Sequence, residues 1–156
     1  ALVENSKASE TVYQFEFHLL NDTRTINAFA LPGGQIFITA ALFAKLKTEG
    51  QLAGVLGHEI GHVVARHSAQ QMAKSNLTKG ILNGILVASD PSGSSAQTAA
   101  YIGQLVNMKF GREDELESDK LGVRLMVKSG YNPEALIGVM RILAEASGGG
   151  GQPEFF

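Results

Sequence analysis

The chain has 156 residues, about the length of one domain, so residues 1–156 are expected to fold as a single unit. Its 13 basic and 15 acidic residues give a formal net charge of −2, which argues against a dedicated nucleic-acid-binding protein. A hydrophobic content of 44% is enough for a core. The sequence has no run of 18 apolar residues, so it predicts no membrane-spanning helix. The absence of cysteine excludes disulfides and thiolate metal sites.

Three short strands are predicted early in the chain. Apolar and polar residues alternate from Thr11 to Leu20, which is the period of a half-buried strand. Turn residues at Asn21–Asp22 and at Pro32–Gly34 separate two further extended segments. The predicted strands cover residues 11–20, 26–31 and 35–39. We expect them to pair as a small antiparallel sheet.

Helices follow the strands. Thr48 and Gln51 form a capping-box pattern, which predicts a helix that begins there and runs past His67. Gly130 suits the position after a helix end, and Asn132–Pro133 suits the start of the next helix. The predicted helices cover residues 41–47, 48 to beyond 67, 74–89, 96–109, 113–129 and 132–146. Strands first and helices afterwards indicate the α+β class.

The segment 80–108 contains a single charged residue, Asp90. We interpret it as a buried helical hairpin joined by a loop at residues 90–95. The alternative is a hairpin that contacts a partner or a membrane. Residues 147–156 are rich in glycine and are predicted to form a flexible tail.

The second predicted helix contains the pattern His58-Glu59-Ile60-Gly61-His62. Residues four apart on a helix differ by about 40° and lie one turn apart, so both imidazoles can reach one metal ion. Glu59 lies about 100° round from His58, where its carboxylate can take a proton from a water on the metal. The alternative is a pair of core histidines with a solvated glutamate.

Glycines interrupt the same helix at positions 54, 57 and 61. Each costs roughly 1 kcal/mol relative to alanine inside a helix. We therefore expect another backbone to pack closely against this face.

A third metal ligand has to be found elsewhere. His67 would lie about 140° from His62 on a continuous helix, so we expect it at the surface or between helices, and His18 falls on the exposed phase of the first strand. An acidic ligand is more suitable, and Glu115 and Asp119 share one face of a predicted helix. Glu115 as the ligand, with Asp119 accepting a hydrogen bond from the N–H of a ligand histidine, fits the usual carboxylate–histidine–zinc arrangement. Spacing alone does not separate the two.

Three ordered motifs resemble metallopeptidase family forty-eight, the family of the CAAX prenyl endoproteases and HtpX-like zinc proteases. They are Asn27 to Ile36, His58 to His62, and Arg112 to Asp119. The lack of spanning helices favours the soluble, periplasmic-type branch. The family often has alanine where this chain has Ser118.

The resemblance implies a compact zincin-like fold of the gluzincin type, with one Zn²⁺ held by His58, His62 and Glu115 and with Asp119 as the companion of Glu115. It also implies that the strand formed by Asn27, Ala28, Phe29, Ala30 and Leu31 is a sheet edge beside the zinc. An extended peptide can pair with such an edge.

The sequence therefore predicts a zinc-dependent endopeptidase that hydrolyses unfolded or misassembled proteins, with Glu59 as the base. Its substrate would be a polypeptide. The family resemblance also implies an extracytoplasmic location, in the periplasm. Two alternatives stay open: a chaperone-like peptide-binding module with a catalytically silent zinc site, and a zinc hydrolase with a non-peptide substrate.

Overall fold

A computed structural model describes residues 1–4, 10–75, 100 and 103–148 of the chain. Strands come first and helices follow, which confirms the α+β class. The elements are β1 (Glu16–Leu20), β2 (Ala28–Ala30), β3 (Gln35–Thr39), α1 (Ala40–Phe43), α2 (Glu49–Val64), α5 (Arg112–Lys128) and α6 (Ala135–Ala146). Residues 67–75 and 103–106 are also helical.

The sheet is mixed, so the prediction of an all-antiparallel sheet was wrong. Its strand order is β1-β3-β2: β3 pairs antiparallel with β2 and parallel with β1. The chain reverses direction twice between β1 and β3, so those two strands run the same way. The prediction assumed that consecutive strands are neighbours, whereas β3 inserts between β1 and β2.

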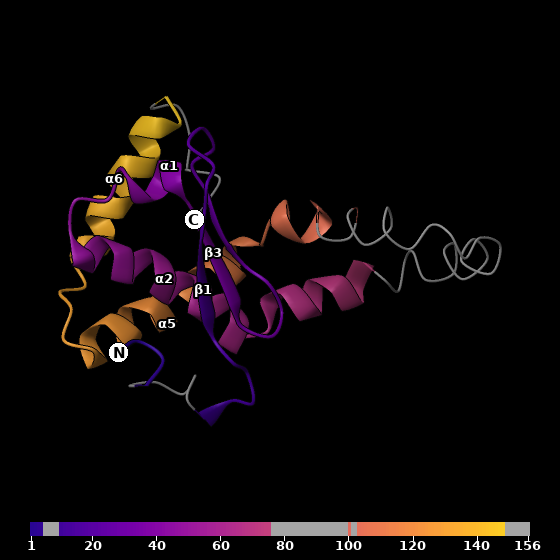
Figure 1. Cartoon of the computed structure of the whole chain (residues 1–156). Helices are drawn as coiled ribbons and strands as arrows, with labels where there is room; N and C mark the ends of the chain where they lie inside the picture. Colours follow the sequence, from indigo (N-terminus) through magenta and orange to yellow (C-terminus); the bar gives the residue numbers. More distant parts are fainter. Residues whose placement is uncertain (5–9, 76–99, 101–102, 149–156) are drawn as a thin grey trace.

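The sheet packs one face against α2 and carries aromatic rings on the other. Ile36, Ile38, Ala28 and Ala30 are buried in the core that they share with α2. On the opposite face the rings of His18, Phe37 and Phe29 stack across all three strands, with centroids 4.8 and 4.9 Å apart. Helix α2 contacts the sheet, α5 and α6, and so forms the centre of the fold (Figure 1).

Helix α2 begins as predicted but ends earlier. The hydroxyl of Thr48 accepts a hydrogen bond from the Gln51 N–H at 3.1 Å. The Gln51 side chain accepts from the N–H of Lys47, one residue before the usual position in a capping box. The helix ends at Val64, because Arg66 has a φ of 61° and turns the chain out of the helix.

Helix α5 crosses α2 at backbone distance. A Cβ built on Gly57 would lie 3.3 Å from the Cα of Gly122, and one built on Gly61 would lie 2.9 Å from the Cα of Ser118. A Cβ on Gly122 would in turn lie 3.0 Å from the backbone nitrogen of His58. The predicted close packing against the glycines of this helix is confirmed. It holds the middle of α5 directly against the turn of α2 that carries the histidines.

Helix boundaries near the C-terminus agree in part with the prediction. Helix α5 matches the predicted 113–129 to within one residue, and Gly130 follows it with a φ of +82°. Helix α6 begins at Ala135, whereas Asn132 was predicted as its N-cap and Pro133 as its first residue. The Asn132 side chain accepts a hydrogen bond from the N–H of Glu134 in a turn before the helix.

Parts of the predicted hairpin and tail lie outside the described residues, namely 76–99, 101–102 and 149–156. In the described part of the hairpin, the helix ends at residue 106 and not at 109. Among the helices of the described ranges, none combines the length and the apolar composition needed to cross a membrane.

Candidate metal centre

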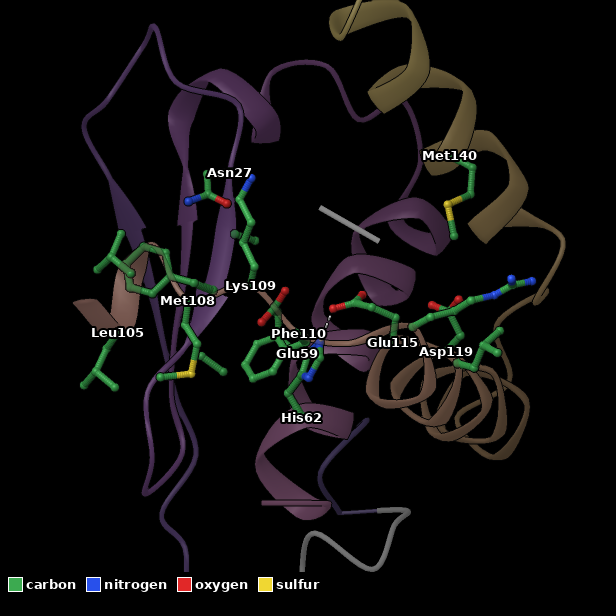
Figure 2. Close-up of a pocket in the computed structure, with 16 residues that line it drawn as sticks. Asn27, Glu59, His62, Leu105, Met108, Lys109, Phe110, Glu115, Asp119 and Met140 are labelled. Atoms are coloured by element: carbon green, nitrogen blue, oxygen red, sulfur yellow. Dashed lines mark ion pairs between the residues drawn. The ribbon is translucent and has the colours of Figure 1, made fainter. Parts of the chain in front are cut away.

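A cleft runs between the β2 side of the sheet and the α2–α5 pair (Figure 2). Its volume is about 500 Å³, which is in the range of ligand-binding pockets. Its lining combines acidic, basic and apolar side chains: Asn27, Ala28, Phe29, Ala30, Glu59, His62, Leu105, Val106, Met108, Lys109, Phe110, Arg112, Glu115, Leu116, Asp119 and Met140.

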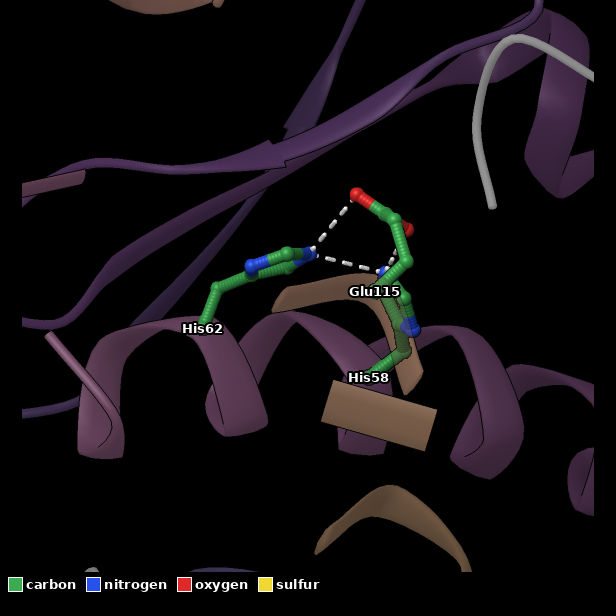
Figure 3. A group of neighbouring side chains, drawn as sticks. All are labelled: His58, His62 and Glu115. Carbon is green, nitrogen blue, oxygen red and sulfur yellow. Dashed lines mark hydrogen bonds and ion pairs between the residues drawn. The ribbon is translucent and has the colours of Figure 1, made fainter. Parts of the chain in front are cut away.

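Three of the predicted site residues converge at this cleft (Figure 3). Ligand atoms of His58, His62 and Glu115 all lie within 4.8 Å of one another. The Nε2 atoms of the two histidines are 2.9 Å apart. The Glu115 carboxylate faces both, with Oε2 at 3.3 Å from Nε2 of His58 and Oε1 at 3.6 Å from Nε2 of His62. Two turns of α2 and the first turn of α5 thus contribute to one cluster.

The donor set fits a divalent metal ion. Within the part of the chain that the structure describes, the buried Oε2 of Glu115 finds no hydrogen-bond partner of good geometry, although buried polar atoms are normally paired. The two facing Nε2 atoms can share only one proton between them, whereas a cation between them would use both lone pairs. Two histidines and a glutamate are a known ligand set for catalytic zinc, with one position left open.

Asp119 lies behind His58 and not among the three converging groups. Its Oδ1 is 2.9 Å from Nδ1 of His58, one helical turn along α5 from Glu115. An Nδ1–H that donates to this carboxylate leaves the Nε2 lone pair of His58 directed at the cluster. The structure thus gives the two carboxylates, which spacing alone did not separate, different positions.

The two histidines of the cluster differ in protonation. Burial lowers the pKa of His58, but the carboxylates of Asp119 and Glu115, at 2.9 and 3.3 Å from its ring nitrogens, outweigh this and raise the pKa to about 9. Burial, with the neighbouring charges of His58 and His67, lowers the pKa of His62 to about 2. In the metal-free protein the shared proton therefore resides on His58.

Glu59 points into the cleft from α2, next to the cluster (Figure 2). Its side chain is buried, and it is not one of the three groups that converge. Burial raises the pKa of Glu59 to about 7, with the positive charge of His58 lowering it and the negative charge of Glu115 raising it. A carboxyl group with a pKa in this range can both accept and return a proton near neutral pH.

His67 is not at the surface, in contrast to one of the two predicted placements. It is 2% exposed, and its Nδ1 lies 3.0 Å from Nδ1 of His62. The 140° offset assumed a continuous helix, but α2 ends at Val64 and the chain turns His67 back toward His62. The second predicted placement, between helices, is the observed one. His18 is partly exposed on β1, where it contacts Gln35.

The predicted substrate-binding segment is an edge of the sheet over part of its length. Within the described residues β2 pairs with β3 on one side only. Asn27, Ala28, Phe29 and Ala30 line the cleft, whereas Leu31 lies beyond the end of β2 and is not part of the lining. Ala28 and Ala30 turn their methyl groups into the core, 4% and 9% exposed.

Sequence reasoning missed Phe110. Its ring stacks on the imidazole of His62 with centroids 4.2 Å apart, and it lies just before α5 in the chain. No local pattern marks this residue, because its contact depends on how the chain returns to α2.

Comparison with known proteins places this chain in a family. The family model described as Peptidase family M48 matches residues 1–156. The chain is 34% identical to the β-barrel assembly-enhancing protease of Yersinia pestis, over 94% of this chain and 31% of that protein. It is 34% identical to the protein of the same name in Escherichia coli K12, over 84% of this chain and 28% of the relative.

A third relative is the mitochondrial metalloendopeptidase OMA1 of Schizosaccharomyces pombe, 34% identical over 78% of this chain and 35% of that protein. The chain thus spans about a third of the length of these curated relatives. Since the family match covers all of its residues, the chain belongs to peptidase family M48.

Proposed function

We propose that this chain is the catalytic part of a zinc-dependent endopeptidase. The observation that carries the proposal is the convergence of His58, His62 and Glu115, with Glu59 beside them on one wall of an open cleft. Membership of a peptidase family supports the reaction class. In this proposal the three converging side chains hold the ion, and Asp119 orients His58.

The ion and Glu59 divide the chemistry. When bound, zinc would lower the pKa of a water toward 7 and polarise the carbonyl of the scissile peptide bond. Glu59 takes a proton from the attacking water and then delivers it to the leaving amine. Its place outside the ligand set and its burial in the cleft wall keep the carboxylate available for these transfers.

We propose that the substrate is an extended polypeptide that adds to the free edge of β2. Leu31 donates its N–H to the carbonyl of Gln35, and Asn27 accepts from the N–H of Thr39, so the odd-numbered residues point their backbone groups at β3. Hydrogen bonding alternates along an antiparallel strand, so the backbone groups of Ala28 and Ala30 point to the free edge.

Pairing with main-chain groups gives affinity without selecting particular side chains. This suits unfolded or misassembled proteins as substrates. The apolar part of the lining, including Leu105, Val106 and Met108, offers contact to the side chains that such proteins expose. We also propose an extracytoplasmic, periplasmic location, since the bacterial relatives are named for β-barrel assembly, and transmembrane β-barrels are typical of the bacterial outer membrane.

The test is the cleavage of an unfolded polypeptide such as casein, with zinc content measured in parallel. Glu59→Gln should bind zinc and fold, and should lose activity by about 10²–10⁴-fold, because only the proton transfer is removed. Glu113→Gln makes the same change on an exposed residue of α5 that does not line the cleft, and should cleave normally.

Full activity in zinc-loaded Glu59→Gln would contradict the mechanism. A wild-type chain that binds zinc and casein but cleaves nothing would instead support the peptide-binding module with a silent site. Cleavage of a small ester or amide but of no peptide would indicate a non-peptide substrate.

A further inference from the structure

The two histidines of the cluster are supported in different ways. His58 contacts a carboxylate directly, through Asp119 at 2.9 Å. His62 contacts a second imidazole, with 3.0 Å between the Nδ1 atoms of His62 and His67. The Nε2 atom of His67 lies 3.1 Å from Oε2 of Glu117 on α5. A chain of three side chains thus leads from the cluster to the protein surface.

The backbone is bent so as to place His67 in this chain. After α2 ends at Val64, Arg66 takes a φ of 61°. This is a left-handed backbone conformation that residues other than glycine disfavour. The helix resumes at residue 67. A helix continued through this point would carry His67 away from His62, so the contact depends on the bend.

Hydrogen-bond chemistry determines where each proton lies. A neutral imidazole has one N–H and one nitrogen lone pair. If His62 is to present the Nε2 lone pair to a metal, its proton has to be on Nδ1, and Nδ1 of His67 has to accept it. The proton of His67 is then on Nε2, where the Glu117 carboxylate accepts it. The reverse arrangement would direct an Nε2–H of His62 at the cluster and block it.

We propose that His67 and Glu117 form a positioning relay that holds His62 in the tautomer and ring orientation needed for metal binding. The proposal rests on the proposed metal site. The ring of Phe110 stacks on the imidazole of His62 and so also restricts rotation of that ring.

An imidazole in this position has an electrostatic advantage over a carboxylate. His62 already lies beside Glu115, at 3.6 Å, in a buried region that also contains Glu59. A further carboxylate on Nδ1 of His62 would add a buried negative charge, which carries a large desolvation cost. The neutral ring of His67 is a spacer that leaves the charge of Glu117 at the surface, where its side chain is 62% exposed.

The first test compares two substitutions of His67 in the 156-residue chain. Zinc affinity is measured by competition with a chromophoric chelator. His67→Leu removes the acceptor and should weaken zinc binding by about 10–100-fold, the usual effect of losing a residue behind a ligand. His67→Gln retains an acceptor for His62 and a donor for Glu117, and should restore most of the affinity. A merely space-filling role would make Leu and Gln equivalent.

Ser118→Ala is the matched control. The Ser118 hydroxyl is buried and lies 3.2 Å from the same Nδ1 of His67, so it competes with His62 for one lone pair. Removing it leaves the relay complete, so zinc affinity should not fall. A loss equal to that of His67→Leu would assign the support to Ser118 and overturn the proposal.

The second test needs neither zinc nor activity. Long-range ¹H–¹⁵N spectra of the metal-free protein identify which ring nitrogen carries each proton. The relay requires protonated Nδ1 on His62 and protonated Nε2 on His67, and Glu117→Ala should weaken this preference. A proton on Nδ1 of His67 in the wild type would overturn the relay, also if His67→Leu does not fold.

These outcomes are distinct from a failure of the proposed function. If the wild type binds zinc and cleaves casein while His67→Leu keeps wild-type affinity, the relay is wrong and the peptidase stands. If the wild type binds zinc and shows the predicted tautomers but does not cleave, the relay stands and the peptidase is wrong.

Discussion

The α2–α5 crossing and the β2 edge form different sides of the cleft and are built in opposite ways. At the crossing, backbone meets backbone, and the glycines of α2 leave no free space between the helices. At the edge, a strand of three residues is paired on one side and presents backbone groups on the other. The groups proposed to bind metal and transfer protons thus lie on the tightly packed side.

This difference has a chemical reason. Metal binding and proton transfer require side chains held to within a fraction of an ångström, which packed helices provide. Recognition of many unfolded sequences requires contacts that do not depend on side chains, which a strand edge provides. Each side of the cleft can therefore be altered with little effect on the other, and the following predictions use this.

The largest expected effect concerns the two carboxylates of α5. Glu115→Ala should reduce zinc affinity by more than the roughly 10–100-fold expected for a residue behind a ligand, because it removes a proposed ligand. Asp119→Ala should fall within that range, because the Asp119 carboxylate lies at Nδ1 of His58, the ring nitrogen that faces away from the cluster. Chelator competition measures both. Equal losses of zinc affinity would contradict the proposed roles, and a greater loss for Asp119→Ala would make Asp119 the ligand.

The crossing itself is tested by a pair of glycine substitutions. In Gly61→Ala the new methyl group would lie 2.9 Å from the backbone of Ser118, so the helices have to separate. Overpacking of this kind costs about 1–3 kcal/mol of unfolding free energy. Zinc affinity should fall as well, since Glu115 and Asp119 move with Ser118.

Gly54→Ala is its control on the same helix. Its methyl group would meet the end of the Leu136 side chain at 3.1 Å, and that side chain can rotate. Replacing glycine within a helix gains up to about 1 kcal/mol, so stability should be unchanged or slightly higher. Denaturant unfolding measures both variants. Equal stability of the two variants would show that α2 and α5 can move apart without a cost in unfolding free energy, which would contradict the prediction.

The edge is tested by Ala30→Pro, which removes an N–H that points to the free side of β2. Proline is tolerated on an edge strand when its missing N–H faces away from the sheet. We expect KM for peptide cleavage to rise several-fold while zinc affinity stays the same. Ala30→Ser keeps the N–H and should retain the wild-type KM. An unchanged KM in Ala30→Pro would exclude strand addition at this residue.

The sequence predicted the part of the site that depends on local spacing. His58, Glu59 and His62 lie on one helix, so the helical repeat alone gives their relative positions. The glycines of that helix predicted the close packing of α5 against α2. Only the family resemblance assigned the ligand role to Glu115 and the supporting role to Asp119. Two residues four apart on one helix face fit either assignment equally well. The structure gives them their separate places through the contact between α5 and α2.

Features that depend on distant contacts were not predictable in this way. The insertion of β3 between the other strands is a tertiary choice with no local pattern. The bend before His67 carries no signal either, because arginine is an unusual residue for a positive φ. The first error came from pairing the strands in the simplest way, and the second from continuing α2 past Val64, whereas tertiary packing decides both features.

The smallest expected effect is a pH dependence of the unfolding free energy of the metal-free protein. The folded-state pKa of His58 is raised from 6.5 to about 9, so its contribution to stability is complete below pH 6.5 and is lost as pH rises through 9. The pKa of Glu59 is raised from 4.5 to about 7, so its contribution is lost as pH rises through 7. The lowered pKa of His62 acts in the opposite direction, but only below pH 6.5.

The loss from Glu59 is nearly complete at pH 7, and the loss from His58 continues from pH 6.5 to about 9. Both have the same sign, so the unfolding free energy of the metal-free protein should decrease toward pH 9. The zinc-loaded protein should not follow, because an ion at Nε2 of His58 replaces the proton there. The fall in melting temperature caused by a chelator should thus be greater at pH 9 than at pH 6.5. Asp119→Asn, which replaces the carboxylate hydrogen bond that raises the pKa of His58 with a weaker amide one, should flatten the dependence. A metal-free stability that is constant or rises over this range would contradict the proton placement on His58.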